Sequence, residues 1–261
     1  MHQPRKRFGQ HFLHDRNVID SIIRAIDPQE DDRLVEIGPG QGALTFPLLE
    51  KCKRLSAIEL DRDLIPLLRE KATNRGELEV INADILKFDL HDLTNPEPYR
   101  IVGNLPYNIS TPLMFHLLNS ISLIQDMHFM VQKEVAQRIV AVPGNRDYGR
   151  LSVMIQYHCQ PQYLFDVAPG SFTPPPRVDS AVIRMTPYSE PPVNTGSFQL
   201  FSEIVKTAFN QRRKTIANSL KAIVATETFE RCGIDSRMRA ENLTLQDFAS
   251  LTRTTFKLIN D

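Results

Sequence analysis

Residues 101–110, IVGNLPYNIS, combine groups that could handle the amine of a nucleobase. An apolar run ends at a glycine and is followed at once by Asn104, Leu105, Pro106 and Tyr107. This tetrapeptide offers an amide oxygen, main-chain carbonyls, a rigid proline and a flat ring. A plain turn after a buried strand would use similar residues, so the rest of the chain has to decide between the two interpretations.

An exocyclic amine on adenine is a poor nucleophile because its lone pair is delocalised into the ring. Oxygen acceptors on both N–H bonds would pull the nitrogen toward tetrahedral geometry and free that lone pair. Asn104 and the Leu105–Pro106 backbone could supply the acceptors, and Tyr107 could hold the base by stacking. No strong base is needed, because the amine can lose its proton after it has been alkylated.

A glycine turn, EIGPGQG at 36–42, predicts a nucleotide site. Gly38 and Gly40 follow an apolar run, and the acidic Glu59 ends the next one, as in folds where a carboxylate takes ribose hydroxyls. Asp84 ends a third run and falls on the same edge of the predicted sheet. Ala43 replaces the last glycine of the full dinucleotide motif. A tight turn with capping acids, or a dinucleotide fold, would share these features.

The tetrapeptide separates these alternatives, because methyl donation from S-adenosylmethionine needs a second site beside the donor. The sulfonium makes this donor intrinsically reactive, so the protein has only to orient the reactants and stabilise charge. We therefore expect S-adenosylmethionine as the cofactor.

Apolar periodicity predicts alternating strands and helices, and hence a mainly parallel sheet with helices on both faces. Two late strands, within 162–169 and 179–188, leave little room for a helix between them and predict a hairpin at the sheet edge. Residues 187–197 are typical of a linker. We expect a Rossmann-like α/β domain at 1–190 and a small all-helical, RNA-binding domain at 197–261.

Composition is that of an ordinary globular protein: 261 residues, 41% hydrophobic and 24% charged, with a formal net charge of zero. No apolar run approaches the ~18 residues needed to span a bilayer, and the basic N-terminus lacks the apolar core of a secretion signal. We therefore expect a cytoplasmic protein. The three cysteines are widely spaced and, with the histidines, predict neither disulfides nor a metal site.

Charge is unevenly distributed along the chain. Basic residues gather at Arg5, Lys6 and Arg7. Residues 205–226 hold five cations, among them Arg212, Arg213 and Lys214, and no acid. Such patches could bind RNA phosphates. Solvated faces of two helices are the alternative.

Motifs along nearly the whole chain resemble the ribosomal RNA adenine dimethyltransferases that modify the small subunit, the kasugamycin-resistance enzymes. NLPYNIS resembles their form of the amino-methyltransferase signature. The other matching segments are KRFGQHFL at 6–13, EIGPGQGALT, IELD, NADIL, SFTPPPRVDSAV at 171–182 and FNQRRKTIANSL at 209–220. The resemblance implies a class I methyltransferase fold and a product of two adjacent N6,N6-dimethyladenosines in the 3′-terminal hairpin loop of small-subunit (16S) RNA. It also implies a role in the biogenesis of that subunit.

The resemblance also implies roles for individual residues. Glu59 would bind the donor's ribose and Asp84 its adenine amine, while Asn104 would contact the target amine. Tyr107 would stack on the target base and Phe172 would close its other side, unless Phe172 only pins its loop to the core. The full set implied to contact the donor is His11, Leu13, Gly38, Gly40, Glu59, Asp84 and Asn104. The partner would be small-subunit RNA in the assembling 30S subunit, bound by a monomer.

Three rival functions remain open at this level. A related methyltransferase of large-subunit RNA would confer macrolide resistance, but the Pro-rich element at 171–182 and KRFGQHFL favour the small-subunit family. A pure ribosome-assembly factor would not need intact site residues. A protein glutamine methyltransferase would prefer NPPY over NLPY.

Overall fold

The computed structural model describes residues 10–93, 98–211 and 213–260. Its nine strands are β1 Phe12–Leu13, β2 Leu34–Ile37, β3 Arg54–Glu59, β4 Glu77–Asn82, β5 Tyr99–Asn104, β6 Ile124–Gln132, β7 Cys159–Val167, β8 Phe172–Thr173 and β9 Ser180–Pro187. Its helices are α1 Arg16–Ile26, α2 Thr45–Cys52, α3 Ile65–Ala72, α4 Ser110–Leu118, α5 Lys133–Val140, α6 Arg150–His158, α7 Phe198–Phe209, α8 Ile216–Leu220, α9 Thr226–Arg231 and α10 Leu245–Asn260. Short 3₁₀ helices in the described residues lie at Leu90–Asp92, Ile121–Leu123, Pro169–Ser171 and Ala240–Asn242.

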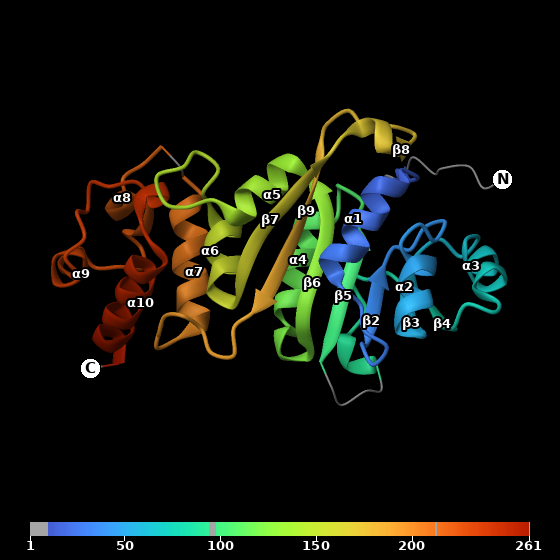
Figure 1. Ribbon diagram of the computed structural model, residues 1–261. Coiled ribbons are helices and arrows are strands. Elements are labelled where there is room, and N and C mark those ends of the chain that lie inside the picture. Colours follow the sequence, from blue (N-terminus) through green and yellow to red (C-terminus); the bar gives the residue numbers. More distant parts are fainter. Residues whose placement is uncertain (1–9, 94–97, 212, 261) are drawn as a thin grey trace. The chain divides into compact units, whose positions relative to one another are not determined.

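Seven strands form one sheet in the order β4-β3-β2-β5-β6-β9-β7 (Figure 1). Parallel pairs join β4 through β6, and β9 runs antiparallel to β6. The strand order reverses between β2 and β5, so the crevice for a ligand lies at the carboxyl ends of these strands. This confirms the predicted α/β fold with a mainly parallel sheet.

The position of β9 refines the prediction for the last two strands. They are neighbours, as expected, but β9 inserts between β6 and β7 and leaves β7 at the edge. The register pairs Val131 with Ala181 and Phe129 with Ile183, all four fully buried. An interior position suits β9 because its run is apolar on both faces.

Helices α1 and α2 cover one face of the sheet through a shared core. The core contains Ile22 and Ile26 from α1, Leu48 and Leu49 from α2, and Val102 from β5. Because right-handed crossovers move in opposite directions from the switch point, α4 covers the other face (Figure 1). Asp15 begins α1 by accepting the N–H groups of Asn17 and Val18.

The chain divides into two compact units. The first contains residues 1–136 and 161–187, with most of the sheet, and the second contains residues 137–160 and 188–261. The second unit has its own core, in which Phe201 of α7 lies 4.8 Å from Tyr157 of α6 and Phe248 of α10 lies 5.8 Å from Phe209, measured between ring centroids. Residues 137–160 therefore belong to the second unit, whereas the sequence predicts that the second domain begins at residue 197. The division into a methyltransferase domain at 1–190 and an RNA-binding domain at 197–261 stays a prediction.

Two short strands, β1 and β8, were not expected from the sequence. They pair antiparallel, with Phe12 opposite Thr173 and Leu13 opposite Phe172. His14 N–H also donates to the carbonyl of Ser171 at 3.0 Å. This ribbon fixes residues 11–13 beside the carboxyl ends of the main sheet.

Candidate active site

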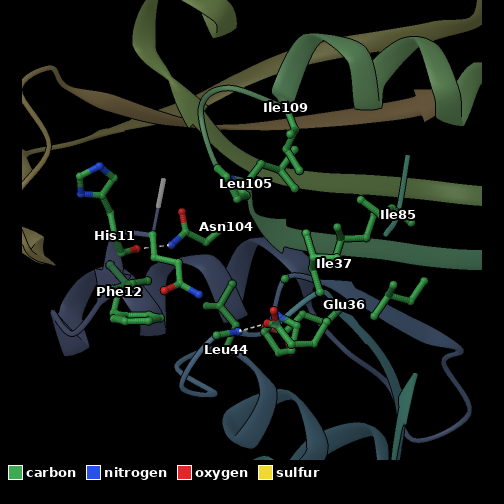
Figure 2. Close-up of a pocket in the computed structure, with 18 of the residues that line it drawn as sticks. His11, Phe12, Glu36, Ile37, Leu44, Ile85, Asn104, Leu105 and Ile109 are labelled. Carbon is green, nitrogen blue, oxygen red and sulfur yellow. Dashed lines mark hydrogen bonds between the residues drawn. The ribbon is translucent and has the colours of Figure 1, made fainter. Parts of the chain in front are cut away.

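A cavity of about 370 Å³ opens at the carboxyl ends of β2, β3 and β5, entirely within the first unit (Figure 2). This volume is within the range of small-molecule sites. It is lined by residues of six segments: 10–13, 36–41, 43–44, 58–60, 83–86 and 104–109. Of the predicted site residues, it collects His11, Leu13, Gly38, Gly40, Glu59, Asp84, Asn104, Leu105, Pro106 and Tyr107.

The glycine turn lets the main chain approach the cavity. Gly38 has φ +66° and Gly40 has φ +57°, a region that side chains disfavour. A Cβ on Gly40 would lie 3.1 Å from the ring of Phe12, whereas one on Gly38 would meet nothing within 4 Å. The space beside Gly38 is therefore open to a ligand.

Glu59 ends β3 and ties this turn to the next loop. Its Oε2 accepts the N–H of Gly40 at 3.1 Å, and its Oε1 accepts the N–H of Asp61 at 2.7 Å. The residue is 5% exposed, and burial raises its pKa while these two N–H groups oppose the rise. A carboxylate held in this way has lone pairs left for a pair of hydroxyl donors.

Asp84 lies in the turn after β4. Its Oδ1 accepts the N–H of Leu86 at 3.1 Å, and its main-chain oxygen accepts the N–H groups of Lys87 and Phe88. These bonds hold the carboxylate at the cavity, where it can accept from an amine.

Asn104 ends β5, and its amide is oriented by the chain's N-terminal segment. Nδ2 donates to the main-chain oxygen of His11 at 3.0 Å (Figure 2). That bond uses the amide's nitrogen and leaves Oδ1 to accept. The carbonyl of Pro106 accepts from Ile109 N–H and Ser110 Oγ at 3.1 and 3.2 Å, so the turn itself uses this oxygen.

Tyr107 is half-buried, and both its hydroxyl and its ring contact other side chains. Its hydroxyl shares a 2.6 Å hydrogen bond with Ser180 Oγ, and its ring stacks on His11 with centroids 5.6 Å apart and planes 27° apart. Burial raises its pKa, which the Ser180 bond only partly opposes, so the phenol is neutral at pH 7. His11 is itself fixed by a 2.7 Å bond between Nδ1 and the carbonyl of Pro174.

Phe172 does not lie on the cavity. It is 2% exposed and belongs to the core cluster together with Leu13, its partner in the β1–β8 ribbon. This burial indicates that Phe172 anchors the loop at 171–178 to the core. Its contact with the second side of a target base stays a prediction.

The predicted RNA contacts are only partly described. Arg5, Lys6, Arg7 and Arg212 lie outside the described residues. Arg213 and Lys214 are exposed in the second unit, just before α8. The described residues contain no group of three or more His, Cys, Asp or Glu side chains that could hold a metal.

Two residues at the site were missed by the sequence reasoning. Ser180 lies in the quoted segment 171–182 but is separated by 73 positions from the tyrosine that it contacts. Glu36 precedes the glycine turn, is 2% exposed and lines the cavity. A charged residue inside an apolar strand was the available signal for Glu36.

Comparisons with known proteins agree with this geometry. The family described as ribosomal RNA adenine dimethylase matches residues 1–257. The chain belongs to this family. The ribosomal RNA small subunit methyltransferase A of Marinobacter nauticus is 52% identical over 263 residues, covering 100% of this chain and 95% of that protein. The protein of the same name from Pseudomonas aeruginosa is 53% identical, covering 96% and 94%.

Solved structures of the family share the fold over nearly the whole length. A dimethyladenosine transferase from Plasmodium falciparum is 26% identical, with a TM-score of 0.80, covering 95% of this chain and 98% of that one. The 23S rRNA methyltransferase ErmE is also 26% identical, with a TM-score of 0.73, covering 94% and 99%. The protein is thus a ribosomal RNA adenine dimethyltransferase, and S-adenosylmethionine is its methyl donor.

The cavity fits this donor on its own chemistry. The open space beside Gly38 leaves room for the ligand. The buried carboxylate of Glu59 can accept hydrogen bonds from ribose hydroxyls, and the carboxylate of Asp84 can accept one from an amine. Glu36 Oε2 is buried and has no hydrogen-bond partner among the described residues. These acids suit a ligand that brings positive charge.

Glu59→Ala is expected to weaken S-adenosylmethionine binding by about 10- to 100-fold, because hydrogen bonds to a charged group contribute about 1.5–3 kcal/mol. Isothermal titration calorimetry of wild type, Glu59→Ala and the exposed control Glu70→Ala measures this. Unchanged affinity in Glu59→Ala would contradict the assignment. Circular dichroism checks that the loss of the Gly40 and Asp61 bonds has not unfolded the variant.

Proposed function

We propose that this enzyme dimethylates two adjacent adenosines in the 3′-terminal hairpin loop of small-subunit (16S) ribosomal RNA. The curated relatives at 52–53% identity carry small-subunit names, which supports the choice of subunit. The observation that carries the chemistry is the 3.0 Å bond from Asn104 Nδ2 to His11, because it fixes which amide atom accepts.

In the proposed site the target amine donates one N–H to Asn104 Oδ1 and the other to the carbonyl of Leu105. Of the two main-chain carbonyls in the turn, that of Leu105 is the better acceptor for the amine, because the carbonyl of Pro106 already accepts two hydrogen bonds. Both acceptors shift electron density onto the nitrogen and hold it in line with the donor. The bound donor supplies an electrophilic methyl group on a sulfonium.

Tyr107 provides the stacking surface for the target base in this proposal. Its hydroxyl bond to Ser180 fixes the ring's tilt. His11 stacks on the same ring, so an arriving base competes with His11 or extends the stack. A site for dimethylation must also accept the bulkier monomethylamine, and stacking is tolerant of that added methyl group.

RNA is held outside the cavity by basic residues. We assign phosphate contacts to Arg5, Lys6, Arg7, Arg212, Arg213 and Lys214. Arg213 and Lys214 are exposed, and the absence of Asp and Glu from residues 205–226 of the sequence favours an anionic partner over a solvated helix face.

Replacing Arg212, Arg213 and Lys214 together with alanine is expected to weaken RNA binding and to lower the slope of log K against log salt concentration by about 2 to 3. Filter binding at several salt concentrations measures both quantities. The triple variant Lys51→Ala, Arg54→Ala, Arg75→Ala is the charge-matched control. Equal affinity and equal slope in wild type and the Arg212–Lys214 variant would show that these cations are solvated and make no phosphate contacts.

The natural substrate in this proposal is the RNA within an assembling 30S subunit, bound by a monomer, without a metal. That substrate would place the enzyme in the cytoplasm. No helix in the described part of the chain has the length and apolar character to cross a bilayer.

The deciding experiment incubates the purified protein with labelled S-adenosylmethionine and small subunits from cells that lack the modification. Four methyl groups per subunit on two adjacent adenosines would support the proposal. Label on large-subunit RNA would favour the specificity named for ErmE instead. Tight subunit binding without label would mean that the protein acts as an assembly factor.

A further inference from the structure

Glu36 is a buried carboxyl group in the cavity that the proposed chemistry does not use. It lies on β2, between Val35 and Ile37, and is 2% exposed. Its Oε2 has no hydrogen-bond partner in the described part of the chain, and neither has the buried Oγ1 of Thr45 at the start of α2. An ionised carboxylate in this position would be strongly disfavoured.

The groups around Glu36 add negative charge and no fixed cation. Glu59 on β3 and Asp84 after β4 line the same cavity, and so does His11, which directly precedes β1. No lysine or arginine of the described segments lines it. On the neighbouring strands Glu36 pairs with the apolar Val102 of β5 and Ala57 of β3, and the residue of β5 that lines the cavity is the neutral Asn104. Burial, and next the charge of Glu59, raise the pKa of Glu36 to about 8, although the nearby Thr45 hydroxyl, which makes no hydrogen bond of ordinary geometry with the described residues, partly opposes the rise.

We propose that Glu36 discriminates the methyl donor from the spent product by exchanging a proton: it is neutral in the empty and product-bound pocket and ionised opposite the donor's positive charge. S-Adenosylmethionine and S-adenosylhomocysteine carry the same ammonium and carboxylate. They differ by the sulfonium, which gives the donor a net charge of +1 and the product a net charge of zero. A buried carboxylate therefore stabilises the donor more than the product.

The proton balance follows from the reaction. Donor binding releases the Glu36 proton to solvent. Methyl transfer breaks the S–C bond, forms the N–C bond and removes one proton from the amine. Glu36 regains a proton from solvent once the sulfur is neutral, so one cycle releases the single proton that the amine loses. Two methyl groups per adenosine require repeated exchange of product for donor, which weak product binding favours.

The inference rests on S-adenosylmethionine being the donor and does not depend on which RNA is methylated. At pH 7, below a pKa of about 8, most of the Glu36 side chains are protonated in the empty pocket. We therefore expect wild type to release most of one proton on binding donor. Its donor affinity should rise by nearly tenfold per pH unit from pH 6 to 7.5 and level off above pH 8.

Isothermal titration calorimetry in buffers of different ionisation enthalpy counts these protons for S-adenosylmethionine and for S-adenosylhomocysteine. Wild type should release clearly fewer protons with the product. Glu36→Gln should abolish the difference and reduce the donor-to-product affinity ratio by about tenfold or more, the factor that corresponds to one pKa unit. The exposed Glu70→Gln is the matched control and should behave as wild type.

Equal proton release with both ligands, or unchanged release in Glu36→Gln, would overturn the inference. If Glu36→Gln does not fold, the ¹³C shift of the Glu36 carboxyl in wild type decides: it should titrate near pH 8 without ligand and stay ionised at pH 7 only with donor. No donor binding in wild type would instead overturn the assigned donor site.

Discussion

Asn104→Ala is expected to lower kcat by about 100- to 1,000-fold, the range seen when one preorganised polar contact to a transition state is removed. The variant keeps β5, whose end is fixed by the main-chain bond from Leu105 N–H to Met130 at 3.0 Å. Donor affinity should change much less, because the donor's ribose and adenine partners, Glu59 and Asp84, remain. Single-turnover methylation of small subunits measures the chemical step.

The matched control is Asn119→Ala, the same substitution at an exposed position just after α4 and outside the lining of the cavity. It should keep kcat within a few-fold of wild type. Asn104→Asp adds a sharper test, since Oδ2 cannot donate to the His11 carbonyl when the carboxylate is ionised. It should lose activity although it keeps an acceptor. Full activity of Asn104→Ala would remove the proposed role.

The sequence was sufficient to predict the elements that carry this site. Strands end at Asn104 and Glu59 as expected, because an apolar run bounded by glycine, proline or acidic residues specifies where a parallel strand stops. The carboxyl ends of parallel strands share an edge, so the approach of Glu59, Asp84 and Asn104 followed from local patterns alone.

What the sequence could not predict depends on contacts between distant residues. Two-residue strands such as β1 and β8 have no periodicity to read, and their pairing alone buries Phe172 against Leu13. An aromatic residue in a Pro-rich loop looks exposed until that partner is known. The bond between Asn104 and His11 spans 93 positions, and the one between Tyr107 and Ser180 spans 73. Contacts between residues so far apart leave no mark in the local sequence pattern.

At the amino end of β5, opposite the cavity, Arg100 is a buried cation whose loss should strongly destabilise the fold. Its guanidinium is 9% exposed and contacts Asp126 through Nε and Nη2 at 3.0–3.2 Å and Asp32 through Nη1 at 2.5 Å. Nη2 also donates to the carbonyl of Ile26 at the end of α1, at 2.6 Å. One side chain therefore joins β5, β6 and the carboxyl end of α1, where a cation is favoured.

Arg100→Ala is expected to lower the free energy of unfolding by about 3–5 kcal/mol, because both carboxylates stay behind without their partner. Urea denaturation measures the loss. The matched control is Arg54→Ala: Arg54 begins β3 of the same sheet and pairs with Glu77 at 3.0 Å, but both side chains are more than three-quarters exposed, at 81% and 76%. An exposed pair of this kind contributes about 0–1 kcal/mol. Similar losses in the two variants would show that burial is not what gives the Arg100 cluster its strength.

The contacts between Arg100 and Asp126 also predict how the loss of unfolding free energy in Arg100→Ala depends on pH. Burial alone would raise the pKa of Asp126, but His128, 3.5 Å away, and Arg100 outweigh it and hold this pKa below its ordinary value. A carboxylate with a lowered pKa in the folded state contributes its stability above its unfolded pKa of about 3.9 and loses it as the pH falls through the folded value. The difference between wild type and Arg100→Ala should therefore be constant from pH 5 to 8 and narrow below about pH 4. A difference that persists undiminished at pH 3 would mean that Arg100 acts mainly through the Ile26 carbonyl, which does not titrate.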